Sequence, residues 1–227
     1  MSFDSRWETD IYAKSRQVNR YPFDQVVSTV FRFFGNSNRS KIDILELGCG
    51  TANNIVFLAQ EGFNATGVDG SQNAIKLGKE LLDSLSLNAA LECLDFSNLS
   101  CFGDETFDMV IDRGSITHNN RQSITDIIQQ VKRILKPNGI FLSIMFSDAH
   151  SGVKVGTRLS DGSFKGFSRG YLKGHKFIFY FASEEDTVEF FDENFEVLSK
   201  LHQINTDYAV DDDVRAMWSV ISRKTGD

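Results

Sequence analysis

The stretch from Ile42 to Thr51 constrains the fold of this chain more than any other part of the sequence. It reads as a short apolar run typical of a buried strand, then a turn with two glycines, then a helix expected over 51–61. Because glycine has no Cβ atom, the backbone at Gly48 and Gly50 can turn sharply and lie directly against a ligand. The amides that open the helix are unpaired donors at a positive dipole end. The sequence therefore predicts a ligand site at the carboxyl end of this strand.

Acidic residues follow the next two expected strands, which span 65–69 and 89–94. Asp69 lies nineteen residues after Gly50, the spacing at which an acid binds both ribose hydroxyls of an adenosine. A carboxylate suits that role because it accepts from two hydroxyls at once. The alternative role of Asp69 is to cap the next helix, for which Ser71 is the expected N-cap.

The sequence Glu46-Leu-Gly-Cys-Gly resembles motif I of the class I S-adenosylmethionine-dependent methyltransferases. Two later blocks match the same superfamily: Phe107-Asp108 before an apolar run, and Leu135-Lys-Pro-Asn-Gly139 before a strand expected over 140–146. The resemblance covers roughly residues 40 to 145. It implies an α/β, Rossmann-like sheet of seven mostly parallel strands, with the last strand antiparallel and helices on both faces.

The resemblance also implies roles for individual residues. Asp95 matches an acid that binds the adenine amino group, and Phe96 matches the residue that flanks the ring. Asp112 and Arg113 emerge near the expected methionine end of the cofactor, and Arg20 could pair with the methionine carboxylate or be an exposed arginine at a helix entrance. The full set expected to bind S-adenosylmethionine is Arg20, Glu46, Gly48, Cys49, Gly50, Asp69, Gly70, Ser71, Asp95, Phe96, Asp112 and Arg113.

Residues 147–176 form a glycine-rich segment that is expected to act as a lid over the substrate. From 150 to 176 it carries six Lys or Arg residues and a single acid, Asp161, although the whole chain has a net charge of −7. A hairpin turn is expected at 160–163. We interpret this charge as a sign of an anionic acceptor, a solvated loop being the alternative. The residues assigned to substrate binding are Arg158, Arg169 and Tyr171.

Two histidines are candidates for a general base that activates an acceptor hydroxyl. His118 and His150 follow the fourth and fifth expected strands, close to the predicted acceptor position. The superfamily often carries a histidine at the place of His118 whatever its acceptor, so that assignment rests on position alone. No spacing typical of a zinc site is present, and no metal is expected.

The two ends of the chain complete one expected domain over 1–227. Residues 1–36 are interpreted as an N-terminal cap with a helix from Phe23 to Phe34. The tail predicts strands over 176–181, 195–204 and 214–223, with a helix capped by Ser183 and an acidic turn at 211–213.

The expected function is methyl transfer from S-adenosylmethionine to a small acceptor. Examples are the hydroxyl or amine group of a sugar or of an anionic nucleotide sugar. Blocks at 19–22 and 112–118 resemble bacterial methyltransferases associated with surface polysaccharides. The alternatives are an NAD-dependent oxidoreductase, which Asn53 and Glu46 disfavour, a non-catalytic binding domain, and a protein or RNA methyltransferase. The acidic balance and an isoelectric point near 5.1 argue against nucleic acid, and we expect a cytoplasmic monomer or homodimer without a membrane span.

Overall fold

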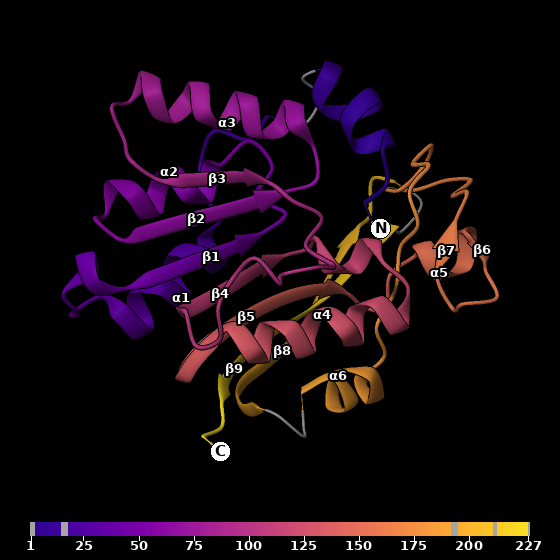
Figure 1. Cartoon of the computed structure of the whole chain (residues 1–227). Helices are drawn as coiled ribbons and strands as arrows, with labels where there is room; N and C mark the ends of the chain where they lie inside the picture. Colours follow the sequence, from indigo (N-terminus) through magenta and orange to yellow (C-terminus); the bar gives the residue numbers. More distant parts are fainter. Residues whose placement is uncertain (1–2, 15–17, 192–194, 211–212, 227) are drawn as a thin grey trace.

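The computed structural model describes residues 3–14, 18–191, 195–210 and 213–226. In these ranges seven strands form one sheet in the order β3-β2-β1-β4-β5-β9-β8 (Figure 1). All neighbouring pairs are parallel except those of β9, which runs antiparallel to both β5 and β8. This confirms the predicted seven-stranded sheet with an antiparallel last strand. The strands are β1 (Asp43–Leu47), β2 (Asn64–Asp69), β3 (Ala90–Cys93), β4 (Phe107–Arg113), β5 (Leu135–Phe146), β8 (Phe195–Asp207) and β9 (Asp213–Lys224).

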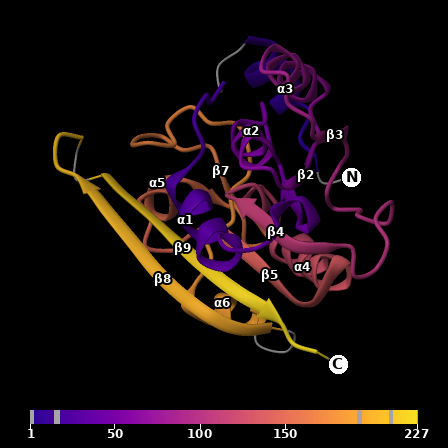
Figure 2. The ribbon, with the colours of Figure 1, turned by 90° about the vertical axis from the view of Figure 1, so that its left-hand side faces the viewer.

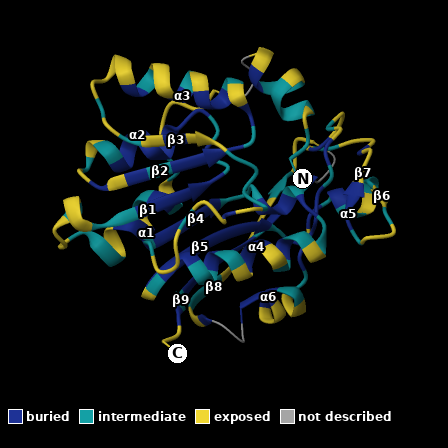
Figure 3. Cartoon of the chain, in the orientation of Figure 1, coloured by how far each residue is buried: buried dark blue, intermediate teal, exposed yellow. Residues whose placement is uncertain are grey.

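Helices cover both faces of the sheet because successive strand residues point to opposite sides. Ile44 packs with α1 (Asp24–Phe34), α2 (Asn53–Gln60) and α3 (Gln72–Ser84). Its neighbour Leu45 packs on the other face, against α4 (Arg121–Ile134) and α6 (Glu184–Phe191). The central strands are largely buried, whereas α3 exposes its outer side (Figure 3). The layers are thus held by two apolar cores that share the sheet.

A third apolar cluster lies beyond the carboxyl ends of the strands. It joins Trp7 and Ile11, from a π-helical turn over Trp7–Ile11, to aromatic residues between 164 and 181. The segment after β5 forms α5 (Gly152–Val155) and a small hairpin of β6 (Thr157–Arg158) and β7 (Phe164–Lys165). The predicted hairpin is confirmed, although its strands are shorter than expected, and α5 was not foreseen.

Three boundaries differ from the sequence prediction. Residues 176–181 are not a strand of the sheet, because the bridge that they form, between Phe164 and Phe179, is an isolated one. β5 begins at Leu135 rather than at residue 140, and residues 135–139 contain a bulge in which Asn138 is left-handed. β8 and β9 extend as a long antiparallel pair at the sheet's edge (Figure 2). In the expected acidic turn, 211 and 212 lie outside the described residues.

Candidate cofactor and acceptor site

A cavity of about 210 Å³ opens at the carboxyl ends of β1, β2 and β4. The register of the parallel strands brings these ends together, because Leu47 pairs with Val68 on one side and with Asp112 on the other. Eleven of the predicted site residues line the cavity: Glu46, Gly48, Cys49, Gly50, Asp69, Gly70, Asp95, Phe96, Arg113, His118 and Tyr171. The topology of the sheet thus gathers residues that lie up to 125 positions apart (171 minus 46).

The glycine turn has the geometry expected of a backbone cradle. Gly48 and Gly50 have φ angles of +66° and +53°, a region that side chains disfavour. A Cβ atom on Gly48 would overlap the side chain of Ser115, and one on Gly50 would lie 2.9 Å from the Tyr12 hydroxyl. Asp69 holds the turn, because its Oδ2 accepts from the Gly50 amide at 3.0 Å and its Oδ1 from the Ser71 amide at 2.8 Å.

Glu46 is a buried acid at the base of the cavity. Its Oε1 accepts a 2.6 Å hydrogen bond from Asn54 Nδ2, while its Oε2 is buried without a partner. Burial raises the pKa of Glu46 to about 8. An unpartnered carboxylate oxygen is costly in an apolar interior, and it suits a cationic group of a ligand.

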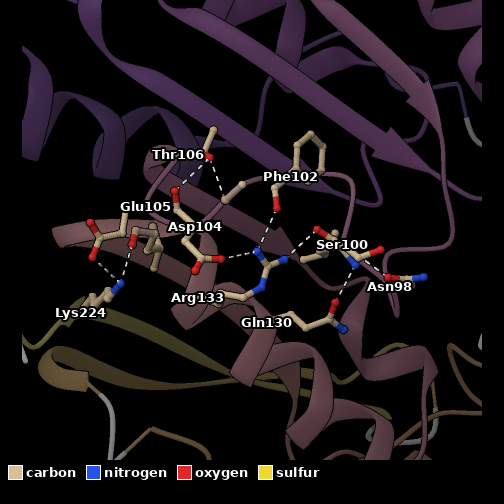
Figure 4. A network of polar contacts seen from close by, with 12 residues as sticks. Asn98, Ser100, Phe102, Asp104, Glu105, Thr106, Gln130, Arg133 and Lys224 are labelled. Carbon is tan, nitrogen blue, oxygen red and sulfur yellow. Dashed lines mark hydrogen bonds and ion pairs between the residues drawn. The ribbon is translucent and has the colours of Figure 1, made fainter.

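The loop after β3, which carries Asp95 and Phe96, is fastened to α4. Gln130 accepts from the Leu99 amide and donates to Ser97 O, both at 2.6 Å. Arg133 donates to Phe102 O at 2.9 Å and to Asp104 at 2.7 Å (Figure 4). This network fixes the position of Asp95 at the rim of the cavity.

Asp112 and Arg113 end β4 but differ in their surroundings. Asp112 is fully buried outside the cavity lining, where it accepts from the amides of Ser115 and Ile116 at 2.8 and 3.0 Å. Burial raises the pKa of Asp112 to about 6. Arg113 lines the cavity with its guanidinium 3.8 Å from the centre of the Phe23 ring. Asp112 therefore stabilises the loop that follows β4.

The two candidate bases, His118 and His150, lie in different surroundings. His118 lines the cavity, and its Nδ1 lies 3.3 Å from the carbonyl oxygen of Ile178. Since a carbonyl only accepts, that contact places the proton of the neutral ring on Nδ1 and leaves a lone pair on Nε2. His150 is buried outside the lining, and its Nδ1 accepts from the Gly152 amide at 2.9 Å. Burial lowers the pKa of each histidine to about 4.

Four other predicted site residues lie away from the cavity lining. Ser71 is the N-cap of α3, since its Oγ accepts from the Ala74 amide. Arg20 is exposed before α1, and Arg158 is exposed in β6. Arg169 lines a second hollow between the lid and β9. Tyr171 is therefore the one predicted substrate residue that the structure brings to the main cavity.

The N-terminal segment closes one side of the cavity. The Phe3 amide donates to Asp95 Oδ2 at 3.1 Å, and the Phe3 ring lies where a Cβ on Gly70 would be. Glu8 accepts from the Asn73 amide at 3.1 Å. The segment therefore covers the part of the site that the sequence assigns to adenosine.

Sequence reasoning missed the aromatic wall of the cavity, which consists of Trp7, Phe146, Phe177 and Phe179 beside His118. The phenylalanines at 177–181 also belong to the third apolar cluster, so they serve as core as well as wall. The available signal was that this group of aromatics directly follows a glycine-rich segment at the expected lid.

Comparison with known proteins supports one family. A model described as a methyltransferase domain matches residues 44–139. The putative methyltransferase YqeM of Bacillus subtilis is 27% identical over 148 residues, which are 65% of this chain and 56% of that protein. Residues 44–139 therefore match a methyltransferase domain, and these comparisons support the class I S-adenosylmethionine-dependent methyltransferase superfamily for this chain. The predicted superfamily and its cofactor are thereby confirmed, and the oxidoreductase alternative is disfavoured.

Two further proteins are similar to this chain, one in sequence and one in fold. A 2-heptyl-1-hydroxyquinolin-4(1H)-one methyltransferase of Mycobacteroides abscessus is 29% identical over 109 residues, 47% of each chain. A 1,6-didemethyltoxoflavin-N1-methyltransferase of Burkholderia thailandensis, solved with that compound and S-adenosylhomocysteine, has a TM-score of 0.70 at 15% identity. It covers 96% of this chain and 85% of its own, which shows a shared fold. The chain spans about half of the length of the curated relatives named here.

The residues around the cavity fit S-adenosylmethionine. The cofactor carries a sulfonium and an ammonium cation, which the unpartnered oxygen of Glu46 suits electrostatically. Gly48 and Gly50 line the cavity with backbone alone, because Ser115 and Tyr12 leave no room for a Cβ atom at either position. Within the described ranges, no group of three or more His, Cys, Asp or Glu side chains is arranged to hold a metal ion. In the same ranges, no helix combines the length and apolar character needed to cross a bilayer.

Proposed function

We propose that this chain transfers the methyl group of S-adenosylmethionine to a nucleophilic atom of a small molecule. One observation carries the proposal: a single cavity joins the glycine turn and the acids of β1 and β2 to a separate wall around His118. The cofactor supplies an electrophilic methyl group on sulfur. The chain's residues bind it, hold the acceptor in line with it and exclude water, and such positioning accounts for much of the rate of a displacement reaction.

His118 is proposed to receive a hydrogen bond from the acceptor. Its Nε2 lone pair is fixed by the Nδ1 contact with Ile178 O. A ring whose pKa lies near 4 orients an acceptor hydroxyl or amine at neutral pH but is a weak base. An amine, or an acidic hydroxyl or thiol that ionises readily, suits such a site.

Cofactor binding is tested by titrating the protein with S-adenosylhomocysteine in a calorimeter. Asp69→Asn is expected to weaken binding by roughly tenfold to a hundredfold, because a charged hydrogen-bond partner contributes about 1.5–3 kcal/mol. Asp69 also holds the turn at Gly50, so the same change loosens the cradle.

Asp108→Asn is the matched control for this titration. Asp108 Oδ2 likewise accepts from a backbone amide, that of Asp43 at 2.8 Å, and from Lys136 at 2.7 Å, but it lies outside the cavity lining. It should lower the unfolding midpoint and leave the affinity for S-adenosylhomocysteine within about twofold. Equal losses of affinity in the two variants, or no binding by the wild type, would contradict the proposal.

A further inference from the structure

The charge of the cavity opposes an anionic acceptor. Four acids line it, namely Asp4, Glu46, Asp69 and Asp95. Burial raises the pKa of Glu46 to about 8, so it is mostly protonated at neutral pH, and Asp4 is paired with Arg6. Asp69 and Asp95 carry the negative charge of the cavity. Among the described lining residues, Arg113 is the one Lys or Arg, and its guanidinium lies against the Phe23 ring. Such a cavity attracts the net positive cofactor and repels a diphosphate.

The basic residues of the lid do not change this balance. Their side chains belong to positions 154, 158, 165, 169, 173 and 176, and none of these is part of the cavity lining. Lys176 lies 3.9 Å from Asp10 of the N-terminal segment, and Arg158 lies over the Phe164 ring. The cations of the lid therefore lie outside the lining of the cavity.

The wall that does face the cavity is aromatic. The Trp7 ring stacks on Phe177 with centroids 4.2 Å apart and an interplanar angle of 16°. His118 meets the Trp7 ring edge-on at 4.9 Å and the Phe179 ring at 4.6 Å. Phe146 continues the wall, 5.5 Å from Phe179. These rings present flat apolar surface and a neutral imidazole to whatever enters.

The wall is held in place from behind. Phe164, Phe167, Leu172 and Phe181 form a buried cluster with Phe177 and Phe179. Rings packed in this way keep one orientation, so a flat ligand meets a preformed surface. Aromatic contacts with offset or edge-on geometry contribute beyond simple area burial.

We propose that the acceptor is a flat, uncharged aromatic or heteroaromatic molecule, and that Trp7 and Phe177 determine this specificity. The inference rests on the proposed function, because it assigns the acceptor half of the same cavity. It replaces the expectation of a nucleotide sugar with an acceptor whose ring packs against the wall, and whose hydroxyl, amine or thiol lies near His118.

The test is competition between two classes of probe in protein saturated with S-adenosylhomocysteine. The probes are 2-naphthol and 8-hydroxyquinoline for the aromatic class, and UDP-glucose for the anionic class, with affinities measured by calorimetry. We expect the aromatic probes to bind at least about tenfold more tightly than UDP-glucose. UDP-glucose binding as tightly as both aromatic probes, or no binding of either aromatic probe, would overturn the inference.

Substitutions locate the bound probe. Trp7→Leu and Phe177→Leu keep apolar bulk but remove a ring, and each should weaken 2-naphthol by about threefold to tenfold. Lys165→Ala, at an exposed position of β7 outside the cavity lining, should leave that affinity unchanged. If the double variant Arg158→Ala/Arg169→Ala instead loses UDP-glucose binding that the wild type shows, the lid recognises an anion and the inference fails.

The chain's own fluorescence gives an independent readout. It has two tryptophans, and Trp218 is buried away from the cavity, stacked on His202. In a Trp218→Phe protein, Trp7 is the one indole, and 2-naphthol should quench it in proportion to occupancy. Saturable binding without any change in Trp7 emission would place the probe elsewhere and overturn the inference.

The two proposals fail in different ways. If S-adenosylhomocysteine does not bind, the proposed function is wrong. If it binds and Asp69→Asn lowers its affinity, while Trp7→Leu leaves the affinity for the aromatic probes unchanged, only the acceptor inference is wrong.

Discussion

Gly48→Ala is expected to lower the free energy of unfolding by about 2–4 kcal/mol and to weaken S-adenosylhomocysteine binding at least about tenfold. Gly48 has a φ angle of +66°, where a residue with a Cβ atom is strained by about 1–2 kcal/mol. The new methyl group would also overlap the side chain of Ser115, which is itself hydrogen bonded to the Gly48 carbonyl. Urea unfolding and calorimetric titration measure the two effects.

Gly62→Ala separates backbone strain from steric overlap. Gly62 has a φ angle of +85°, and a Cβ atom there would have no neighbour within 4 Å. It should therefore cost only about 1 kcal/mol and leave cofactor binding unchanged. If Gly48→Ala and Gly62→Ala destabilise the protein equally, the Ser115 side chain moves aside at little cost, and the turn is less constrained than its contacts indicate.

The grouping of the proposed cofactor residues in one cavity could be predicted because its signals are local. Gly48, Glu46 and Asp69 each stand at a fixed offset from a strand end, and parallel strands bring their carboxyl ends to one edge of the sheet. The same logic placed Asp95 at that edge. Ser71 was correctly expected as the N-cap of α3, since capping depends on neighbours in sequence.

The aromatic wall that we propose for the acceptor could not be predicted, because it depends on contacts between distant segments. Trp7 and Phe177 stack although 170 positions separate them (177 minus 7). The positive charge of the lid predicted an anionic acceptor. Packing decides which side chains line the cavity, however, and the six lid cations are not among them. Asp112 shows the same limit, because it stands at the expected strand end but turns into the fold.

Glu46→Gln is expected to stabilise the protein at pH 8 by about 2–4 kcal/mol while weakening cofactor binding. Burial disfavours the ionised carboxylate, and one of its oxygens has no partner. Glutamine has nearly the same shape, keeps an oxygen for the Asn54 hydrogen bond and carries no charge. A gain in stability that accompanies a loss of affinity is characteristic of a residue retained for binding.

The pKa of Glu46 in the folded and unfolded states determines how the stability gained by Glu46→Gln changes with pH. The pKa of Glu46 is about 8 in the folded protein and close to 4.5 in the unfolded chain. Between those values the folded protein retains a proton that the unfolded chain releases, so this group's contribution to stability is lost as pH rises. The advantage of Glu46→Gln should therefore be near zero at pH 4.5, grow up to pH 8 and then level off.

Thermal and urea unfolding at several pH values measure this advantage, with Glu92→Gln as the control because Glu92 is exposed in β3. Cofactor affinity should respond in the opposite sense. A cationic ligand favours the ionised form of Glu46, so wild-type binding should tighten as pH rises toward 8, and Glu46→Gln should abolish that trend. A pH-independent difference in stability, or unchanged affinity in Glu46→Gln, would show that the buried carboxylate serves the fold rather than the cofactor.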